Sequence, residues 1–182
     1  MKNKFMKATA SLIVVFLIFL WYESRDDGKI PVGVNGVSHM GTRYSISQYY
    51  VDDFYGSNIG REGGGGSHTC CVILPREWRP GMIVDLRWEV YDYERKSLTR
   101  YRARVPVEKY KEVGDVVVHI FRDNSARFVT SIWDVMSANH PVAWGESDGG
   151  SRASKGTQIA TLFTEQEIKA FEQRQGPRGS WR

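Results

Sequence analysis

The sequence has few of the residues on which most enzyme and metal sites depend. Its 182 residues include two cysteines and four histidines, and neither a Gly-x-Ser-x-Gly nor a His-Glu-x-x-His motif occurs. The first motif presents a nucleophile at a sharp turn, and the second places two zinc ligands on one helix face. Two acidic pairs are present, Asp26 with Asp27 and Asp52 with Asp53, but adjacent carboxylates in loops or strands are ordinarily solvated. We therefore expect no enzyme activity.

The body of the chain also lacks an excess of one charge. The formal net charge is +4, from 25 lysines and arginines against 21 acidic residues. Three of the basic residues, Lys2, Lys4 and Lys7, lie at the very start, so 25 − 3 = 22 basic residues face 21 acidic ones elsewhere. A nucleic-acid-binding domain is expected to carry a basic patch. We expect no nucleic-acid partner.

The longest apolar run, residues 8–22, directly follows these lysines. A basic segment before an apolar run indicates export, with the positive flank left inside. The run is short for a membrane span, which usually takes about 20 residues, and its bulky end offers no small-residue cleavage site. We favour a signal anchor over residues 1–27, with a cleaved signal peptide and a buried core helix as alternatives. Either export signal places the rest of the chain in the periplasm, anchored to the inner membrane if the segment is not cleaved.

Beyond residue 27 the chain consists of short segments rich in β-branched and aromatic residues, separated by turn residues. This pattern is typical of antiparallel β structure. Alternation is clearest at residues 82–91, where one face is apolar, with Trp88 in the core, and the other is charged. We predict an all-β fold, an antiparallel β-sandwich of about seven strands within residues 28–146. The predicted strands are residues 30–37, 44–51, 69–74, 83–91, 99–105, 113–121 and 127–132.

The end of the chain, residues 147–182, is predicted to be a flexible linker followed by a short helix. Residues 145–156 are small and polar, as in linkers. Thr164 and Glu167 have the spacing of a capping box, which predicts a helix over residues 165–174. A basic tail follows it.

Four glycines and both cysteines lie close together, and we assign them structural roles. Their segment enters a β-branched run without the lysine and helix of a phosphate loop, so the glycines are expected to form a turn. Neighbouring side chains on a strand point to opposite faces, which disfavours one metal ion between the cysteines, and the histidines are widely spaced. We expect no metal and no cofactor. A vicinal disulfide, two free thiols with one in the core, and an intermolecular bridge all stay open. The residues are Gly63, Gly64, Gly65, Gly66, Cys70 and Cys71.

Aromatic residues with arginines nearby are the candidates for a protein interface. Trp and Arg bury large areas and still satisfy a polar edge. Two tryptophans lie in segments with proline or glycine, where exposure and burial are equally expected; Trp133 is read as core. The predicted interface residues are Arg76, Trp78, Arg79 and Trp144.

One long string carries a family resemblance. Residues 58–81 read NIGREGGGGSHTCCVILPREWRPG, residues 84–88 read VDLRW, and residues 117–121 read VVHIF. Together they resemble the bacterial domain-of-unknown-function 3304 family (DUF3304), over roughly residues 31–146.

This resemblance implies a function. Members of that family resemble exported or lipid-anchored envelope proteins, and some are encoded beside type VI secretion lipase effectors, where they look like immunity proteins. It implies an inner-membrane-anchored, periplasm-facing immunity protein that binds and neutralises a secreted lipase or phospholipase effector. Unlike the lipid-anchored members, the chain has no cysteine near its start. Two alternatives stay open, an accessory chaperone or adaptor of the effector and a glycan- or lipid-binding module.

Overall fold

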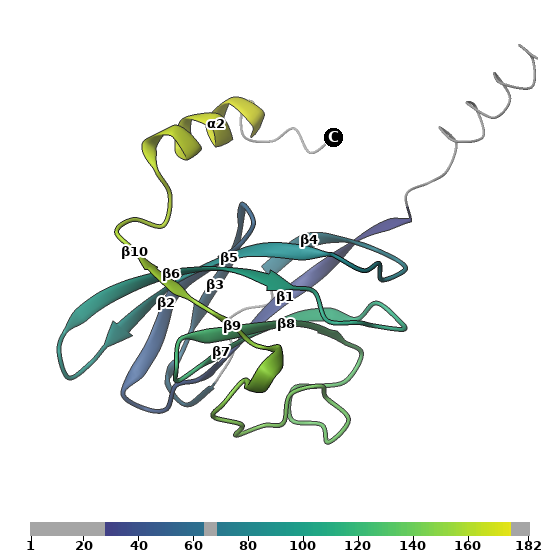
Figure 1. Cartoon of the computed structure of the whole chain (residues 1–182), viewed down its shortest axis with the longest axis horizontal. Coiled ribbons are helices and arrows are strands. Elements are labelled where there is room, and N and C mark those ends of the chain that lie inside the picture. The colour runs from purple at the N-terminus through teal and green to yellow at the C-terminus, as the bar shows by residue number, and fades with distance from the viewer. Residues whose placement is uncertain (1–27, 64–68, 176–182) are drawn as a thin grey trace, which may run out of the picture.

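The computed structural model describes residues 28–63 and 69–175, which form two five-stranded sheets (Figure 1). Sheet A has the strand order β4-β1-β7-β8-β9, and sheet B has the order β10-β6-β5-β2-β3. The strands are β1 (Lys29–His39), β2 (Tyr44–Val51), β3 (Phe54–Ile59), β4 (Thr69–Pro75), β5 (Ile83–Asp92), β6 (Ser97–Pro106), β7 (Asp115–Phe121), β8 (Ser125–Ser131), β9 (Ser154–Lys155) and β10 (Thr157–Ile159). The helical elements are η1 (Arg61–Gly63), η2 (Gly150–Arg152) and α2 (Glu165–Gln175).

One hydrophobic core lies between the two sheets. Leu86 and Trp88 from β5, Tyr49 from β2 and Phe128 from β8 are among its fully buried members. The apolar β5 side chains face this core as predicted, and Trp88 has no exposed surface. The opposite, charged face was expected to be solvated, but Arg87 and Glu89 on it are buried as well, because they are covered by ion pairs with neighbouring segments. The sandwich architecture predicted from the strand pattern is confirmed.

Sheet A is mixed rather than antiparallel, which corrects the prediction for one strand pair. β1 and β7 run parallel, with Val34 opposite Val116 and His39 opposite Phe121. A hairpin must be antiparallel, whereas strands far apart along the chain are free to pair in either direction. Hydrophobic periodicity identifies a strand but carries no information on the direction of its neighbour.

The structure also contains strand β3, which the sequence did not predict. Its residues include Gly56, which reads as a strand breaker. The ring of Tyr49 from β2 lies against Gly56, and a β-carbon there would overlap that ring. The glycine is thus needed for the contact between two strands, and its presence hid the strand.

The segment predicted to be a flexible linker instead closes one side of the sandwich. β9 pairs with β8 of sheet A, and β10 pairs with β6 of sheet B, so residues 154–159 pass from one sheet to the other. Gly156 lies between them, and its amide donates to the Asn124 carbonyl at 2.8 Å. These strands are held through their main chain, which side-chain composition does not reveal.

Helix α2 begins at the predicted capping box. The Thr164 amide donates to Glu167 Oε2 at 2.8 Å, and the Glu167 amide donates to Thr164 Oγ1 at 3.2 Å. No helix within residues 28–63 and 69–175 is long and apolar enough to cross a membrane. The predicted anchor at residues 1–27 and the last part of the basic tail, residues 176–182, lie outside the described residues.

Arg87 on the outer face of sheet B holds the segment that leads into α2. Its side chain is buried, and it pairs with Asp85 and Glu167 at 2.7 Å each. It also donates to the Leu162 carbonyl and lies under the ring of Phe163. The hydrogen bond from Arg87 lowers the pKa of Glu167 to about 2. Arg87 is therefore the main link between α2 and the sandwich.

Replacing Arg87 by methionine is expected to release α2 while the sandwich stays folded. Methionine keeps apolar bulk beneath the segment but removes both ion pairs and the bond to the Leu162 carbonyl. Hydrogen exchange of residues 165–175 should become much faster, with the core strands unchanged. Arg104→Met, at an exposed position on β6, is the control. Unchanged protection of α2 would contradict this role.

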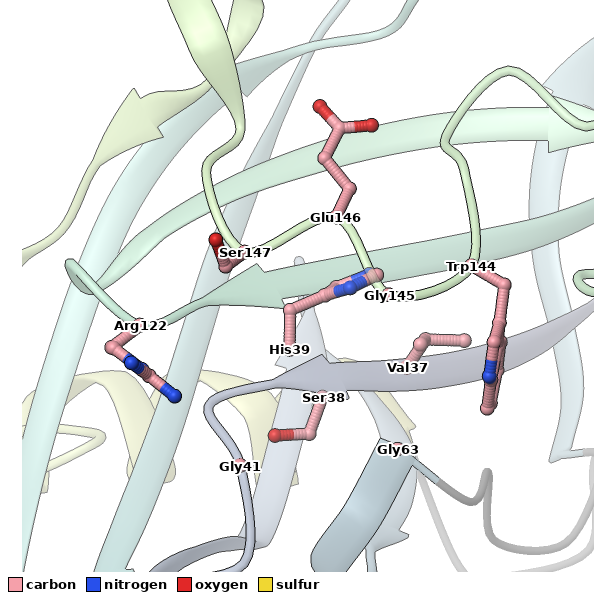
Figure 2. Close-up of a pocket in the computed structure, with 10 residues that line it drawn as sticks. All are labelled: Val37, Ser38, His39, Gly41, Gly63, Arg122, Trp144, Gly145, Glu146 and Ser147. Carbon is pink, nitrogen blue, oxygen red and sulfur yellow. The ribbon is translucent and has the colours of Figure 1, made fainter.

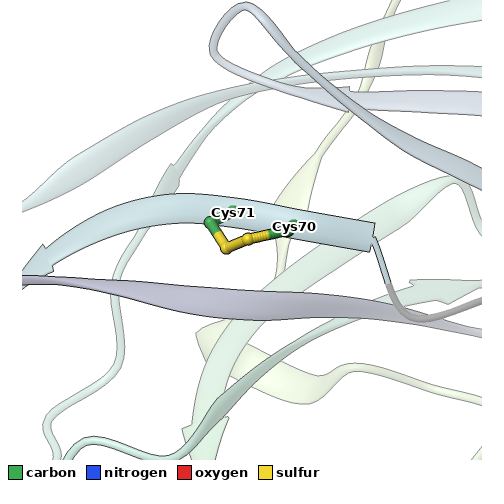
Figure 3. Close-up of a disulfide and its surroundings, with 2 residues drawn as sticks. All are labelled: Cys70 and Cys71. Atoms are coloured by element: carbon green, nitrogen blue, oxygen red, sulfur yellow. A yellow bond between two sulfur atoms is a disulfide. The ribbon is translucent and has the colours of Figure 1, made fainter. Parts of the chain in front are cut away.

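The cysteine pair forms a vicinal disulfide at the start of β4 (Figure 3). Cys70 is exposed and Cys71 is half-buried, so the alternative with one free thiol in the core is wrong. Gly63 ends η1 with φ +85° and is packed beneath the ring of Trp144. Gly64, Gly65 and Gly66 lie outside the described residues.

Candidate binding site at the end of strand β1

The outer face of sheet A is covered by residues 132–153, here called the outer segment. Val142 of this segment is fully buried against Phe121, Val117 and Val129 in a second, smaller hydrophobic cluster. Strand β8 is consequently buried along its whole length. Sheet A is thus covered on both faces, and the outer segment belongs to the folded domain.

Three histidines form a hydrogen-bonded chain beneath the outer segment, here called the histidine string. His39 Nε2 lies 2.9 Å from His119 Nδ1, and His119 Nε2 lies 3.0 Å from His140 Nε2. His140 Nδ1 lies 3.3 Å from the Trp133 carbonyl, which can only accept. The string therefore joins β1 and β7 to the outer segment.

Burial is the main electrostatic influence on the histidine string. It lowers the pKa of His39 and of His140, and that of His119 well below its usual value. Within the string, His39 and His140 lower the pKa of His119 further, and so does the cation of Arg127. The buried imidazoles thus favour the neutral form.

Arg127 ties the same region together from β8. Its side chain is 1% exposed and donates to Glu108 at 2.5 and 3.0 Å. It also donates to the Pro141 carbonyl at 3.3 Å and lies 3.8 Å from the Glu146 carboxylate. Arg127 is therefore a buried cation whose partners include two residues of the outer segment.

A pocket of about 240 Å³ opens where β1 ends, here called the β1-end pocket (Figure 2). Val37 and the ring of Trp144 form an apolar side. Arg122, from the turn between β7 and β8, and Ser38 lie on the other side, and His39 lies between them. Its full lining is Val37, Ser38, His39, Gly41, Gly63, Arg122, Trp144, Gly145, Glu146 and Ser147.

The four predicted interface residues do not form one surface. The Arg76 amide donates to the Gly28 carbonyl, at the start of β1, whereas Trp144 lies beside Val37 near its end. At about 3.3 Å per residue, these places are roughly 30 Å apart. Arg79 is exposed like Arg76.

Two tryptophans differ from their predicted surroundings. Trp78 packs partly on the main core, and its indole N–H donates to the Val107 carbonyl at 2.8 Å. Trp133, read as core, is instead 49% exposed. The outer segment explains the difference, because it passes over the sheet without burying this side chain.

The histidine string was missed because its members lie far apart in the sequence. One signal was available. His119 interrupts the apolar run of residues 116–121, and a strand that is apolar on both sides is expected to be buried on both faces. Such a strand predicts a buried, hydrogen-bonded histidine at position 119, although its partners cannot be inferred from one sequence.

The histidine string is not arranged around a metal ion. Within residues 28–63 and 69–175, no group of three or more His, Cys, Asp or Glu side chains is placed to hold one. Both ring nitrogens of His119 face the other two imidazoles. The string is thus a linear hydrogen-bonded chain.

The histidine string should make the fold acid-sensitive. A histidine whose pKa is lowered in the folded state binds fewer protons there than in the unfolded chain. Its contribution to the stability of the fold is therefore lost as the pH falls below about 6.5. We expect the free energy of unfolding to decrease between pH 7.5 and 5.5, by up to about 1.4 kcal/mol per pH unit for each histidine that stays neutral. Urea denaturation at the two pH values measures this. Equal stability at both would contradict it.

Comparison with known proteins finds a matching family model but no individual relative. No curated protein matches the chain, and no solved structure matches it either. One family model matches residues 40–128. This range contains His119, Arg122 and Arg127, whereas His39 and the outer segment lie outside it. Residues 40–128 match the family described as "Protein of unknown function (DUF3304)", and this match supports the DUF3304 family.

Proposed function

We propose that this domain binds and neutralises a secreted lipase or phospholipase effector of a type VI secretion system, on the periplasmic side of the inner membrane. The main support for this proposal is a set of exposed apolar side chains on the outer segment. Each is between 43% and 68% exposed, although the segment itself is packed on sheet A. The group consists of Ile132, Trp133, Met136 and Trp144.

Exposed apolar side chains on an ordered segment favour tight binding. Aromatic anchors contribute most of the affinity at many protein interfaces, and a surface that is already ordered loses less entropy when the partner binds. The histidine string and Arg127 hold the outer segment from beneath, through His140 and the Pro141 carbonyl. The outer segment is thus suited to present its exposed side chains without rearrangement.

Binding is favoured over catalysis by the way the histidines are used. A general base must be able to reach the proton that it removes. Both nitrogens of His119 are hydrogen-bonded to other histidines, and His119 is buried beneath the outer segment. We therefore propose an inhibitor rather than an enzyme.

Capture of the effector tests this proposal. Full-length protein immobilised through its C-terminus should retain a lipase from envelope extracts, and cells that lack the protein should be killed by that lipase. Arg104→Gln, a change at an exposed position on β6, should retain the lipase as the native protein does. If such cells survive but no longer export the lipase, the protein is an accessory factor. If lipid or peptidoglycan fragments bind and no lipase does, it is a ligand-binding module. Either result overturns the proposed function.

A further inference from the structure

The β1-end pocket carries one cation with no partner of its own. Within the described residues, Arg122 makes no hydrogen bond or ion pair that would occupy its guanidinium. In Figure 2 this guanidinium and the Ser38 hydroxyl reach toward the space beside Gly41, whereas the Glu146 carboxylate points away. Glu146 is engaged elsewhere, by the Ala143 amide and by Arg127. The pocket is therefore a site for an anionic group.

The size and the walls of the pocket limit what that group is attached to. Sites for drug-sized ligands usually measure about 300–1,000 Å³, and this cavity of about 240 Å³ is smaller. Val37 and the ring of Trp144 form an apolar wall across the pocket from the guanidinium and the hydroxyl. Arginine pairs best with planar carboxylate or phosphate groups. The fitting ligand is a carboxylate on a short apolar stem, as in a glutamate side chain or a small free acid.

The number of protons that the histidine string needs for its hydrogen bonds links the string to this pocket. Besides its three contacts above, the string interacts at its pocket end with the main-chain carbonyl of Glu146, which raises the pKa of His39. Main-chain carbonyls thus lie at both ends, and four imidazole N–H groups are needed if all four contacts are to be hydrogen bonds. Three neutral imidazoles supply three. One additional proton, which gives the string a single positive charge, supplies the fourth imidazole N–H.

We propose that the β1-end pocket binds a carboxylate on a short apolar stem and that the histidine string takes up one proton as it binds. The groups that face the string are Arg127, Asp134, the Glu146 carboxylate and, across the pocket, Arg122. Arg127 opposes the additional proton, whereas Glu146 at His39 and Asp134 at His140 favour it. A carboxylate bound by Arg122 adds negative charge at the pocket end of the string and so favours the proton further. This inference does not depend on a lipase partner.

The test uses small probes and the full-length protein. The probes are acetyl-Gly-Glu-Gly-amide, its glutamine counterpart and butyrate, and binding is followed by the NMR shifts of the Trp144 indole and the Gly145 amide. The glutamate peptide or butyrate should bind and the glutamine peptide should not. Tighter binding of the glutamate peptide assigns the carboxylate to a polypeptide, and tighter binding of butyrate assigns it to a free acid. Equal binding of the glutamate and glutamine peptides would overturn the proposal.

Two variants test the role of the Arg122 cation and the role of the additional proton independently. Arg122→Gln should weaken carboxylate binding about ten- to a hundredfold, whereas Arg104→Gln should leave it unchanged. In the native protein, affinity should fall by up to about tenfold per pH unit as the pH rises from 6 to 8. His39→Gln should bind with little pH dependence, because the glutamine amide donates to His119 Nδ1 and the two remaining histidines then need no additional proton. Unchanged affinity in Arg122→Gln, or the same pH dependence in His39→Gln as in the native protein, would overturn the proposal.

Discussion

Replacing Arg127 by methionine is expected to lower the free energy of unfolding by about 3–5 kcal/mol, because a buried ion pair that loses one partner leaves a poorly compensated charge. The charge left behind is that of Glu108, which is 15% exposed, is bonded twice by Arg127, and keeps only the largely exposed Arg152 as an ionic partner, at 3.1 Å. The Pro141 carbonyl loses a donor as well. Urea denaturation measures the change.

The same variant should loosen the outer segment more than the sandwich core. Hydrogen exchange of residues 132–148 should accelerate in Arg127→Met under conditions in which β5 and β6 remain protected. Arg104→Met, an exposed arginine on sheet B, controls for loss of a cation. A loss of stability below about 1 kcal/mol would show that Arg127 does not hold the two layers together.

Truncation of Trp144 to alanine is expected to weaken binding of the lipase by about 2–4 kcal/mol, or roughly 30- to 900-fold. Trp144 is 43% exposed and its ring lies against Gly63, so the side chain is both accessible and supported. Its removal should change the free energy of unfolding little. Calorimetric titration with the captured lipase gives the affinity.

Trp78 provides the contrasting variant. It packs on the main core and donates to the Val107 carbonyl, so Trp78→Ala should mainly lower stability, while the folded fraction still binds the lipase. The opposite result, a loss of affinity with Trp78→Ala and none with Trp144→Ala, would move the interface to the loop between β4 and β5.

Much of the fold could be predicted because its signals are local. The apolar face around Trp88 and the capping box of Thr164 and Glu167 depend on residues close in sequence, and both appear in the structure. The parallel pairing of β1 with β7 and the crossing from β9 to β10 depend on main-chain contacts between distant segments. A single sequence has no local signature for these.

The candidate site lies at the limit of what the sequence could show. Trp144 was singled out by its residue type and its glycine neighbour, but its partners in the pocket come from three other segments. His39, His119 and His140 are brought together only by the pairing of β1 with β7 and by the outer segment. Long-range assembly of this kind is what sequence spacing could not reveal.

The central claim, neutralisation by stoichiometric binding, is tested most directly by titrating a fixed amount of the captured lipase with the full-length protein and measuring lipid hydrolysis. We expect activity to fall in proportion to the protein added and to reach background at a fixed molar ratio, whereas Trp144→Ala should be needed in large excess. Undiminished hydrolysis in the presence of excess native protein would contradict it.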